Sequence, residues 1–194
     1  MCSLGEIYSV RIPLCLSSSL SLLLIVDGCG RGGSRIARRE ACSLVSKQEV
    51  QSVQGAPVNE TKSSEQTDGI FLVSQCFYTA TEFSKSVNLA LVQQDPNQRG
   101  KSPRDFWKEK FSDNDASDPD HDEKAKRGKE PETTPPKKVA GLGDDAYWVR
   151  NRFGGVLYVL KGARFISIGL GGPDDEATKL EKSKQLAQKA IQKL

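Results

Sequence analysis

The sequence has little of the material from which catalytic and metal sites are built. Its 194 residues include one His, one Met and five Cys, and aromatic side chains make up 7%. No Cys-x-x-Cys pair occurs, so neither a zinc site nor a thioredoxin-like site is indicated. The 28 Lys and Arg nearly balance the 25 Asp and Glu, and a net charge of +3 does not indicate a nucleic-acid partner. We expect a chain that is not an enzyme and binds no cofactor, metal or nucleic acid.

Long hydrophobic runs are also missing, apart from one near the N-terminus. Residues 12–26 form an uncharged apolar run, shorter than the ~20 residues of a transmembrane helix but suited to a signal peptide. Val26-Asp27-Gly28-Cys29 follows and resembles the lipobox of bacterial lipoproteins. The resemblance implies that 1–28 are a signal peptide and that Cys29 becomes the lipid-modified first residue. A simple secreted protein, or a buried first strand, is the alternative interpretation.

The stretch after Cys29 is rich in glycine and carries four arginines but no acid as far as Arg39. Its composition is typical of a flexible tether. Arginines beside a lipid anchor are attracted to anionic head groups by ~1 kcal/mol each. We therefore expect 29–45 to tether an exported domain to a membrane, on its periplasmic or exterior side.

The remaining cysteines predict a disulfide. Cys2 and Cys15 would leave with the signal peptide and Cys29 would carry lipid, so Cys42 and Cys76 remain. Two cysteines in an exported chain favour a bridge, and closing a loop of this length stabilises a fold by ~4 kcal/mol in the chain-entropy model. Two buried free thiols are the alternative.

Local signals in the first half of the chain predict two helices and two strands. Ser46 and Glu49 have the spacing of a capping box, which predicts a short helix over 46–54 that ends at Gly55. Residues 71–79 are a candidate strand, and apolar residues alternate with others over 86–91, which predicts a second one. Ser102-Pro103 predicts the start of another short helix.

Aromatic and basic residues alternate in the helix that begins near Ser102. Trp107 and Phe111 lie four positions apart and so share one helical face, with Lys108 and Lys110 beside them. Aromatic residues among basic ones can stack on nucleic-acid bases. Packing against the core of the domain is the simpler interpretation of this spacing, and we favour it.

Residues 112–138 are predicted to be a disordered insertion. They contain an acidic block, then lysines and prolines, and no apolar residue larger than alanine, so they cannot bury enough surface to offset ordering. The alternating aspartates suggest a calcium loop starting at Asp113, but its sixth and twelfth positions hold Asp118 and Lys124 instead of Gly and Glu. The one histidine, His121, lies in the same segment.

The C-terminal third predicts a meander and a long helix. Gly141 and Gly143 suit a tight turn, with Asp144 bonding backbone amides, before a strand over 146–149. Residues 156–160 and 164–170 are predicted to form a hairpin around Gly162. An amphipathic lysine-rich helix follows Pro173. The fold class is α+β: a single antiparallel sheet of about five strands over 46–194, with a short N-terminal and a long C-terminal helix packed on one face.

Taken together, these features resemble small uncharacterised bacterial envelope lipoproteins. The features are the lipobox-like Cys29, the arginine and glycine tether, Cys42 before a capped helix, Cys76-Phe77-Tyr78, residues 141–148 and the lysine-rich terminal helix. The resemblance covers about 29–194 without the insertion. It implies a fold, an anchor and a disulfide, and it supplies no catalytic residues.

Three functions are compatible with these observations. The first is a non-catalytic, lipid-anchored extracytoplasmic module that binds an unknown envelope protein or small ligand. The second is a ligand-sensing accessory domain, which an apolar pocket between the sheet and the last helix would favour. The third is a carboxylate-dependent hydrolase in which Asp144 and Asp145 divide acid and base roles.

Overall fold

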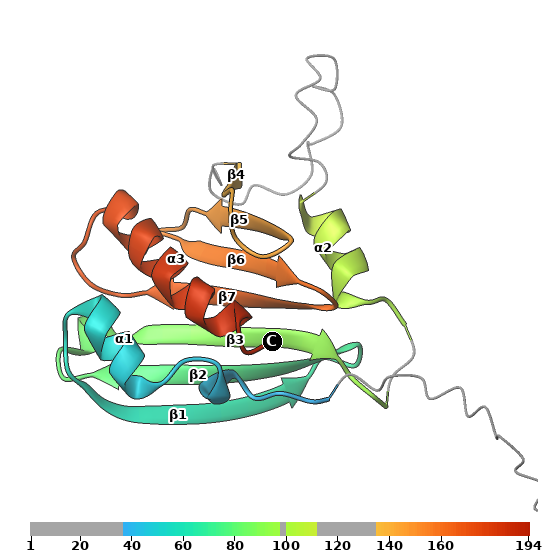
Figure 1. Cartoon of the computed structure of the whole chain (residues 1–194), viewed down its shortest axis with the longest axis horizontal. Coiled ribbons are helices and arrows are strands. Elements are labelled where there is room, and N and C mark those ends of the chain that lie inside the picture. Colours follow the sequence, from blue (N-terminus) through green and yellow to red (C-terminus); the bar gives the residue numbers. More distant parts are fainter. Residues whose placement is uncertain (1–36, 98–99, 112–134) are drawn as a thin grey trace, which may run out of the picture. The chain divides into compact units, whose positions relative to one another are not determined.

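A computed structural model describes residues 37–97, 100–111 and 135–194, which form a seven-stranded antiparallel sheet with three α-helices (Figure 1). The strand order is β1-β2-β3-β7-β6-β5-β4. Residues 1–28, Cys29 and most of the predicted insertion, including His121, lie outside the described residues. Within the described ranges no helix is long and apolar enough to cross a membrane.

The elements follow one another along the chain in a simple order. The strands are β1 (Val58–Thr67), β2 (Phe71–Ala80), β3 (Val87–Gln94), β4 (Lys137–Lys138), β5 (Asp145–Val149), β6 (Val156–Lys161) and β7 (Arg164–Leu170). The helices are α1 (Lys47–Gln54), α2 (Pro103–Phe111) and α3 (Glu176–Ile191), with short 3-10 turns η1 (Ala41–Ser43) and η2 (Phe83–Lys85). Both helices of the first half and the hairpin around Gly162 lie where the sequence predicts them.

Two strands were not predicted, so the expectation of about five strands is corrected to seven. Nine of the ten residues of β1 are exposed, and the strand is held by antiparallel pairing with β2. Because neither face of β1 is buried, its sequence carries no apolar alternation. The strand β4 pairs Lys137 with Trp148 and Lys138 with Tyr147. The predicted insertion therefore ends before these two lysines.

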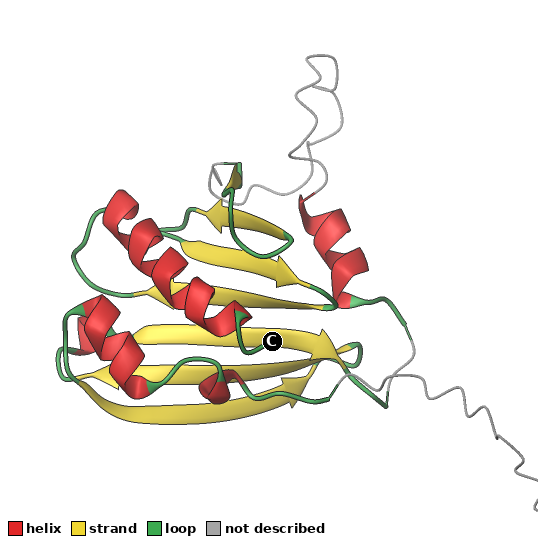
Figure 2. Ribbon diagram, viewed as in Figure 1, coloured by secondary structure: helices red, strands yellow, loops and turns green. Residues whose placement is uncertain are grey.

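The helices α1 and α3 cover one face of the sheet, as predicted (Figure 2). Ser46 caps α1 in a full capping box with Glu49, and Asp175 caps α3 through the Thr178 amide. Alternate strand residues meet the two helices in the main core, which includes Tyr78, Leu89, Leu91, Trp148, Leu157, Ile166 and Ile168. Leu186, Ala187 and Ala190 are the buried contacts from α3.

The helix α2 contributes to the opposite face, so not every helix lies on the same side. Trp107 and Phe111 pack with Tyr147, Leu160 and Phe165 in a second, smaller cluster. The rings of Phe111 and Tyr147 stack with centroids 4.5 Å apart. The aromatic spacing of α2 is thus a packing face.

The C-terminal part of the predicted tether belongs to the folded domain. Ala41, Leu44 and Val45 are completely or almost completely buried, and the Ala41 amide donates a 2.9 Å hydrogen bond to Ser74. These short apolar side chains lie against the sheet, so the boundary of the tether moves to before residue 41. The predicted Cys42–Cys76 disulfide is confirmed, and it joins η1 to β2.

The connections of the sheet gather at two ends (Figure 1). We call the first the turn end: it comprises the turns 139–144 and 161–164, and the described chain begins there, because Arg164 donates to the Ala37 carbonyl. We call the second the loop end: it comprises the connections 81–86, 150–155 and 171–175. The Gly171 amide donates to Ser86 there, and Lys179 donates to the Phe153 carbonyl.

Candidate functional site

Asp144, one of the two candidate catalytic carboxylates, is committed to the turn end. It accepts a 2.9 Å hydrogen bond from the Gly162 amide and pairs with Arg104 and Lys161. The hydrogen bond from the Gly162 amide lowers the pKa of Asp144 below its usual range, and Arg104 and Lys161 add smaller effects in the same direction. Asp144 therefore fastens two neighbouring turns, as an aspartate that satisfies a backbone amide does. The amide belongs to the adjacent hairpin instead of its own turn.

Asp145 is committed to different partners. Its carboxylate accepts a 3.0 Å hydrogen bond from the buried Trp107 indole and lies 3.8 Å from the Lys138 amine. Asp144 thus binds Gly162 and Arg104, while Asp145 binds Trp107, three residues further along α2. Each of the two carboxylates therefore has its own set of partners within the fold.

The two predicted turn glycines both have positive φ, at +79° for Gly141 and +59° for Gly143. A Cβ on Gly143 would lie 2.3 Å from the Leu160 carbonyl oxygen, whereas a Cβ on Gly141 would meet open space. Gly143 is therefore required for close backbone contact between the turn and β6, and the Asp144 amide donates to that same carbonyl at 2.8 Å.

The core between the central strands of the sheet and the last helix is closed. Val45, Tyr78, Leu89 and Leu186 line a small apolar void that cannot admit a water-sized molecule. The Tyr78 hydroxyl donates a 2.6 Å hydrogen bond to the Val45 carbonyl, and burial raises the pKa of Tyr78 to about 12. Core side chains therefore fill the place where an apolar ligand pocket between the sheet and α3 would lie.

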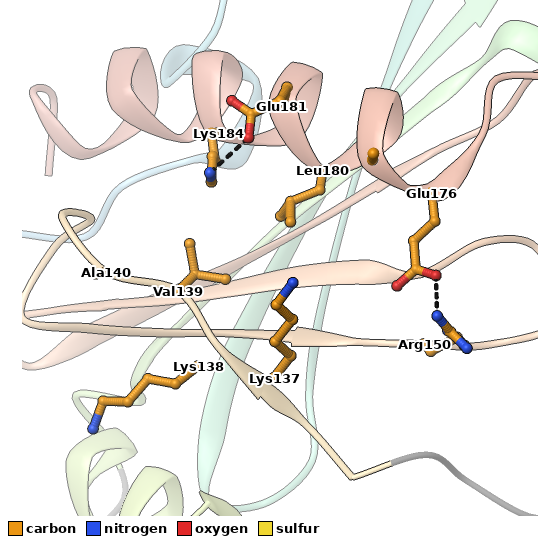
Figure 3. Close-up of a pocket in the computed structure, with 10 residues that line it drawn as sticks. Lys137, Lys138, Val139, Ala140, Arg150, Glu176, Leu180, Glu181 and Lys184 are labelled. Carbon is orange, nitrogen blue, oxygen red and sulfur yellow. Dashed lines mark hydrogen bonds and ion pairs between the residues drawn. The ribbon is translucent and has the colours of Figure 1, made fainter.

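A charged groove of about 620 Å³ lies beside α3 instead (Figure 3). The exposed Lys137 side chain extends into it, between an apolar wall and an ion pair of Arg150 with Glu176. Val139 and Leu180 form the apolar wall. Because β4 alternates across the sheet, Lys138 points to the other side, over the Tyr147 ring. The groove therefore combines one central amine with apolar contacts.

Two partners hold the Glu176 side chain in this groove. Its carboxylate pairs with Arg150 and accepts a 2.9 Å hydrogen bond from the buried Trp148 indole. The Arg150 interaction, with help from Trp148 and the charge of Lys137, holds the pKa of Glu176 below its usual range, although partial burial opposes it. At the other end Glu181 pairs with Lys184 at 2.7 Å. Sequence reasoning missed this groove because its residues come from three separate segments.

An aromatic hollow of about 810 Å³ lies at the loop end. We define it by Phe77, Phe83, Arg152, Phe153 and Lys179, with Gly171 at its rim. Phe83 and Phe153 are 70% and 68% exposed, and the Arg152 guanidinium lies 4.8 Å from the centre of the Phe153 ring. Sequence reasoning treated 152–155 as a connection only, because nothing local shows that it meets residue 83.

Comparisons with protein-family models, with curated proteins and with solved structures find no match. Among the described residues no group of three or more His, Cys, Asp and Glu is arranged to hold a metal ion. Two surfaces remain as candidates, namely the charged groove and the aromatic hollow.

Proposed function

We propose that this chain is a non-catalytic interaction module of the bacterial cell envelope, exported and held at a membrane by lipid on Cys29. The observation that carries the proposal is the Cys42–Cys76 disulfide. Disulfides of this structural kind persist in oxidising compartments. Together with the apolar run at 12–26 and the lipobox-like Val26-Asp27-Gly28-Cys29, it supports export and anchoring.

The commitments of the acidic side chains support binding over catalysis. A general acid and base must reach a common substrate, within ~2.6–3.2 Å of the proton each transfers. Asp144 is engaged by the Gly162 amide and Arg104, and Asp145 by the Trp107 indole on α2. Both carboxylates therefore act in the fold, which leaves a hydrolase that uses them as the least supported function.

The anchor is tested by replacing single cysteines in the full chain expressed in its host. We expect the native chain to fractionate with membranes and the Cys29→Ser variant to be released from them or to keep its uncleaved signal peptide. Cys15→Ser is the matched control, because it also removes a thiol from the N-terminal region but leaves the lipobox. Equal membrane association of the native chain and Cys29→Ser, with masses that differ only by the exchange of sulfur for oxygen, would contradict the lipid anchor.

Ligand sensing is the second candidate function, and the charged groove favours it. The Lys137 amine lies beside Val139 and Leu180, an arrangement that suits a small anion with an apolar body. Sodium octanoate is a suitable probe, with binding followed by amide chemical shifts. We expect Lys137→Gln to weaken binding and Lys62→Gln, on β1 at the opposite edge of the sheet, to leave it unchanged. Equal binding by both variants would remove the groove from the account.

A further inference from the structure

We propose that the aromatic hollow binds an extended segment of a partner protein in which an apolar side chain stands next to a carboxylate. The inference deepens the proposed interaction role and rests on it. The hollow is formed by Phe77, Phe83, Arg152 and Phe153 at the loop end.

Two rings at the hollow stay in water where a folded chain usually buries them. Large exposed hydrophobic side chains among the described residues are Phe83, Phe153 and Ile70, and the two phenylalanines border the same hollow. They come from different connections, η2 and the β5–β6 loop. Clustered exposed aromatic side chains mark binding surfaces more often than scattered ones. Aromatic anchors of this kind contribute much of the affinity at protein interfaces.

The loops that carry these rings are already fixed in place. Gln54, at the end of α1, donates to the carbonyls of Lys85 and Gly171 at 2.8 and 3.0 Å. Lys179, almost completely buried on α3, donates to the Phe153 carbonyl at 2.9 Å. A Cβ on Gly171 would lie 2.0 Å from the Ser84 carbonyl oxygen, so the two connections touch through backbone. A preformed surface binds with less loss of conformational entropy than a mobile one.

The charge of the hollow indicates which polar group a binding partner would carry. The acids beside it are neutralised, since Glu82 pairs with Lys85 at 2.8 Å and Asp174 with Lys182 at 2.6 Å. Arg152 lies over Phe153 and has no ion pair with an acid within the described ranges. An arginine whose guanidinium lies over an aromatic ring still has N–H donors for a carboxylate. A carboxylate next to an apolar side chain complements both groups.

A protein segment suits the hollow better than a bilayer does. The hollow of about 810 Å³ beside the exposed rings has room for side chains of a peptide segment. The described chain begins at the turn end, where Arg164 binds the Ala37 carbonyl, and the eight-residue strand β3 spans about 25 Å between the two ends. The described chain therefore begins at the end of the sheet opposite the hollow.

Selection from a displayed library of random dodecapeptides tests the proposal on the full chain, purified in detergent with its disulfide formed. We expect selected peptides to share an aromatic or aliphatic residue beside Asp or Glu. The Phe83→Ser/Phe153→Ser double variant should weaken their binding about tenfold or more, as loss of central anchors does. Arg152→Glu should remove the preference for acids. Ile70→Ser and Lys108→Glu are matched controls that change an exposed apolar and an exposed basic side chain elsewhere.

Each other outcome overturns the proposal in a recognisable way. Peptides that bind the double variant as tightly as the native chain would place the interaction elsewhere. Association of the chain with itself that the double variant abolishes would assign the hollow to a second copy. Binding to phosphatidylethanolamine and phosphatidylglycerol vesicles, lost in the double variant, would assign it to lipid. If no peptide is selected but a co-purifying partner still binds the double variant, the proposal for the hollow is contradicted and the proposed interaction role stands. If no peptide is selected and no partner is found, both proposals are contradicted.

Discussion

At the turn end the carboxylate of Asp144 is bound by partners within the chain, whereas at the loop end two phenylalanine rings remain in water. Asp144 binds Gly162 and Lys161 of the neighbouring hairpin and Arg104 of α2, so its contacts fasten one turn to another turn and to a helix. Phe83 and Phe153 instead extend outward from loops that are themselves held in place. The turn-end side chains therefore stabilise the fold, whereas the loop-end rings are available for contact with another molecule.

The largest expected effect concerns the segment through which the described chain begins. Replacing both bridged cysteines, Cys42→Ser/Cys76→Ser, should lower the free energy of unfolding by about 4 kcal/mol, because the bridge closes a loop with a sequence separation of 34. Urea unfolding measures it, and reduction of the native chain should give the same loss. A change below about 1 kcal/mol would show that segment 41–45 is held by packing alone.

The turn end should tolerate little change at its closest backbone contact. Gly143→Ala should cost about 3 kcal/mol, since positive φ and a Cβ placed 2.3 Å from the Leu160 oxygen both oppose alanine. Gly141→Ala, at a similar φ but in open space, should cost only about 1 kcal/mol. Equal losses in thermal or urea unfolding would show that the contact with β6 relaxes freely.

Asp144→Asn should remove about 1 kcal/mol of stability at neutral pH and should affect no catalytic activity. The folded-state pKa of Asp144 is lowered, so its contribution is present above the unfolded pKa of about 3.9 and is lost as pH falls through the folded value. The native chain and the variant should therefore converge in stability at acid pH. Glu181→Gln, in an exposed pair within α3, is the control. A constant difference down to low pH would contradict the assignment.

The smallest effect is expected at the loop end. Phe153→Ser should change the free energy of unfolding by less than about 0.5 kcal/mol, because the ring is 68% exposed. Phe165→Ser, in the cluster under α2, should cost more than about 3 kcal/mol. The two variants distinguish a ring that packs in the core from a ring exposed to solvent. A large loss of unfolding free energy in Phe153→Ser would mean that Phe153 is needed for the fold.

Sequence reasoning reached the elements that have an internal signal. The capping box at Ser46, the alternation in β3 and the glycine turn at Gly162 each specify local structure. The cysteine count also gave the bridge between Cys42 and Cys76 correctly. Neighbouring residues, or a count of cysteines, are sufficient for these predictions, so no knowledge of the tertiary fold is needed.

The features that were missed depend on pairing or on assembly from distant segments. The strand β1 has no buried face to produce a period of two, and the two lysines of β4 follow a proline-rich stretch. The charged groove joins Lys137, Arg150 and Glu176, and the aromatic hollow joins Phe83 to Phe153. Their proximity follows from the strand order, which no local pattern in the sequence carries.

The intact mass of the protein purified from the membranes of its host tests the central claim most directly. The account predicts a chain that starts at Cys29, carries the added mass of acyl groups, and is two hydrogens lighter than its dithiol form. That result would place the domain outside the cytoplasm and at a membrane. An unprocessed chain that starts at Met1 with free thiols at Cys42 and Cys76 would contradict the account.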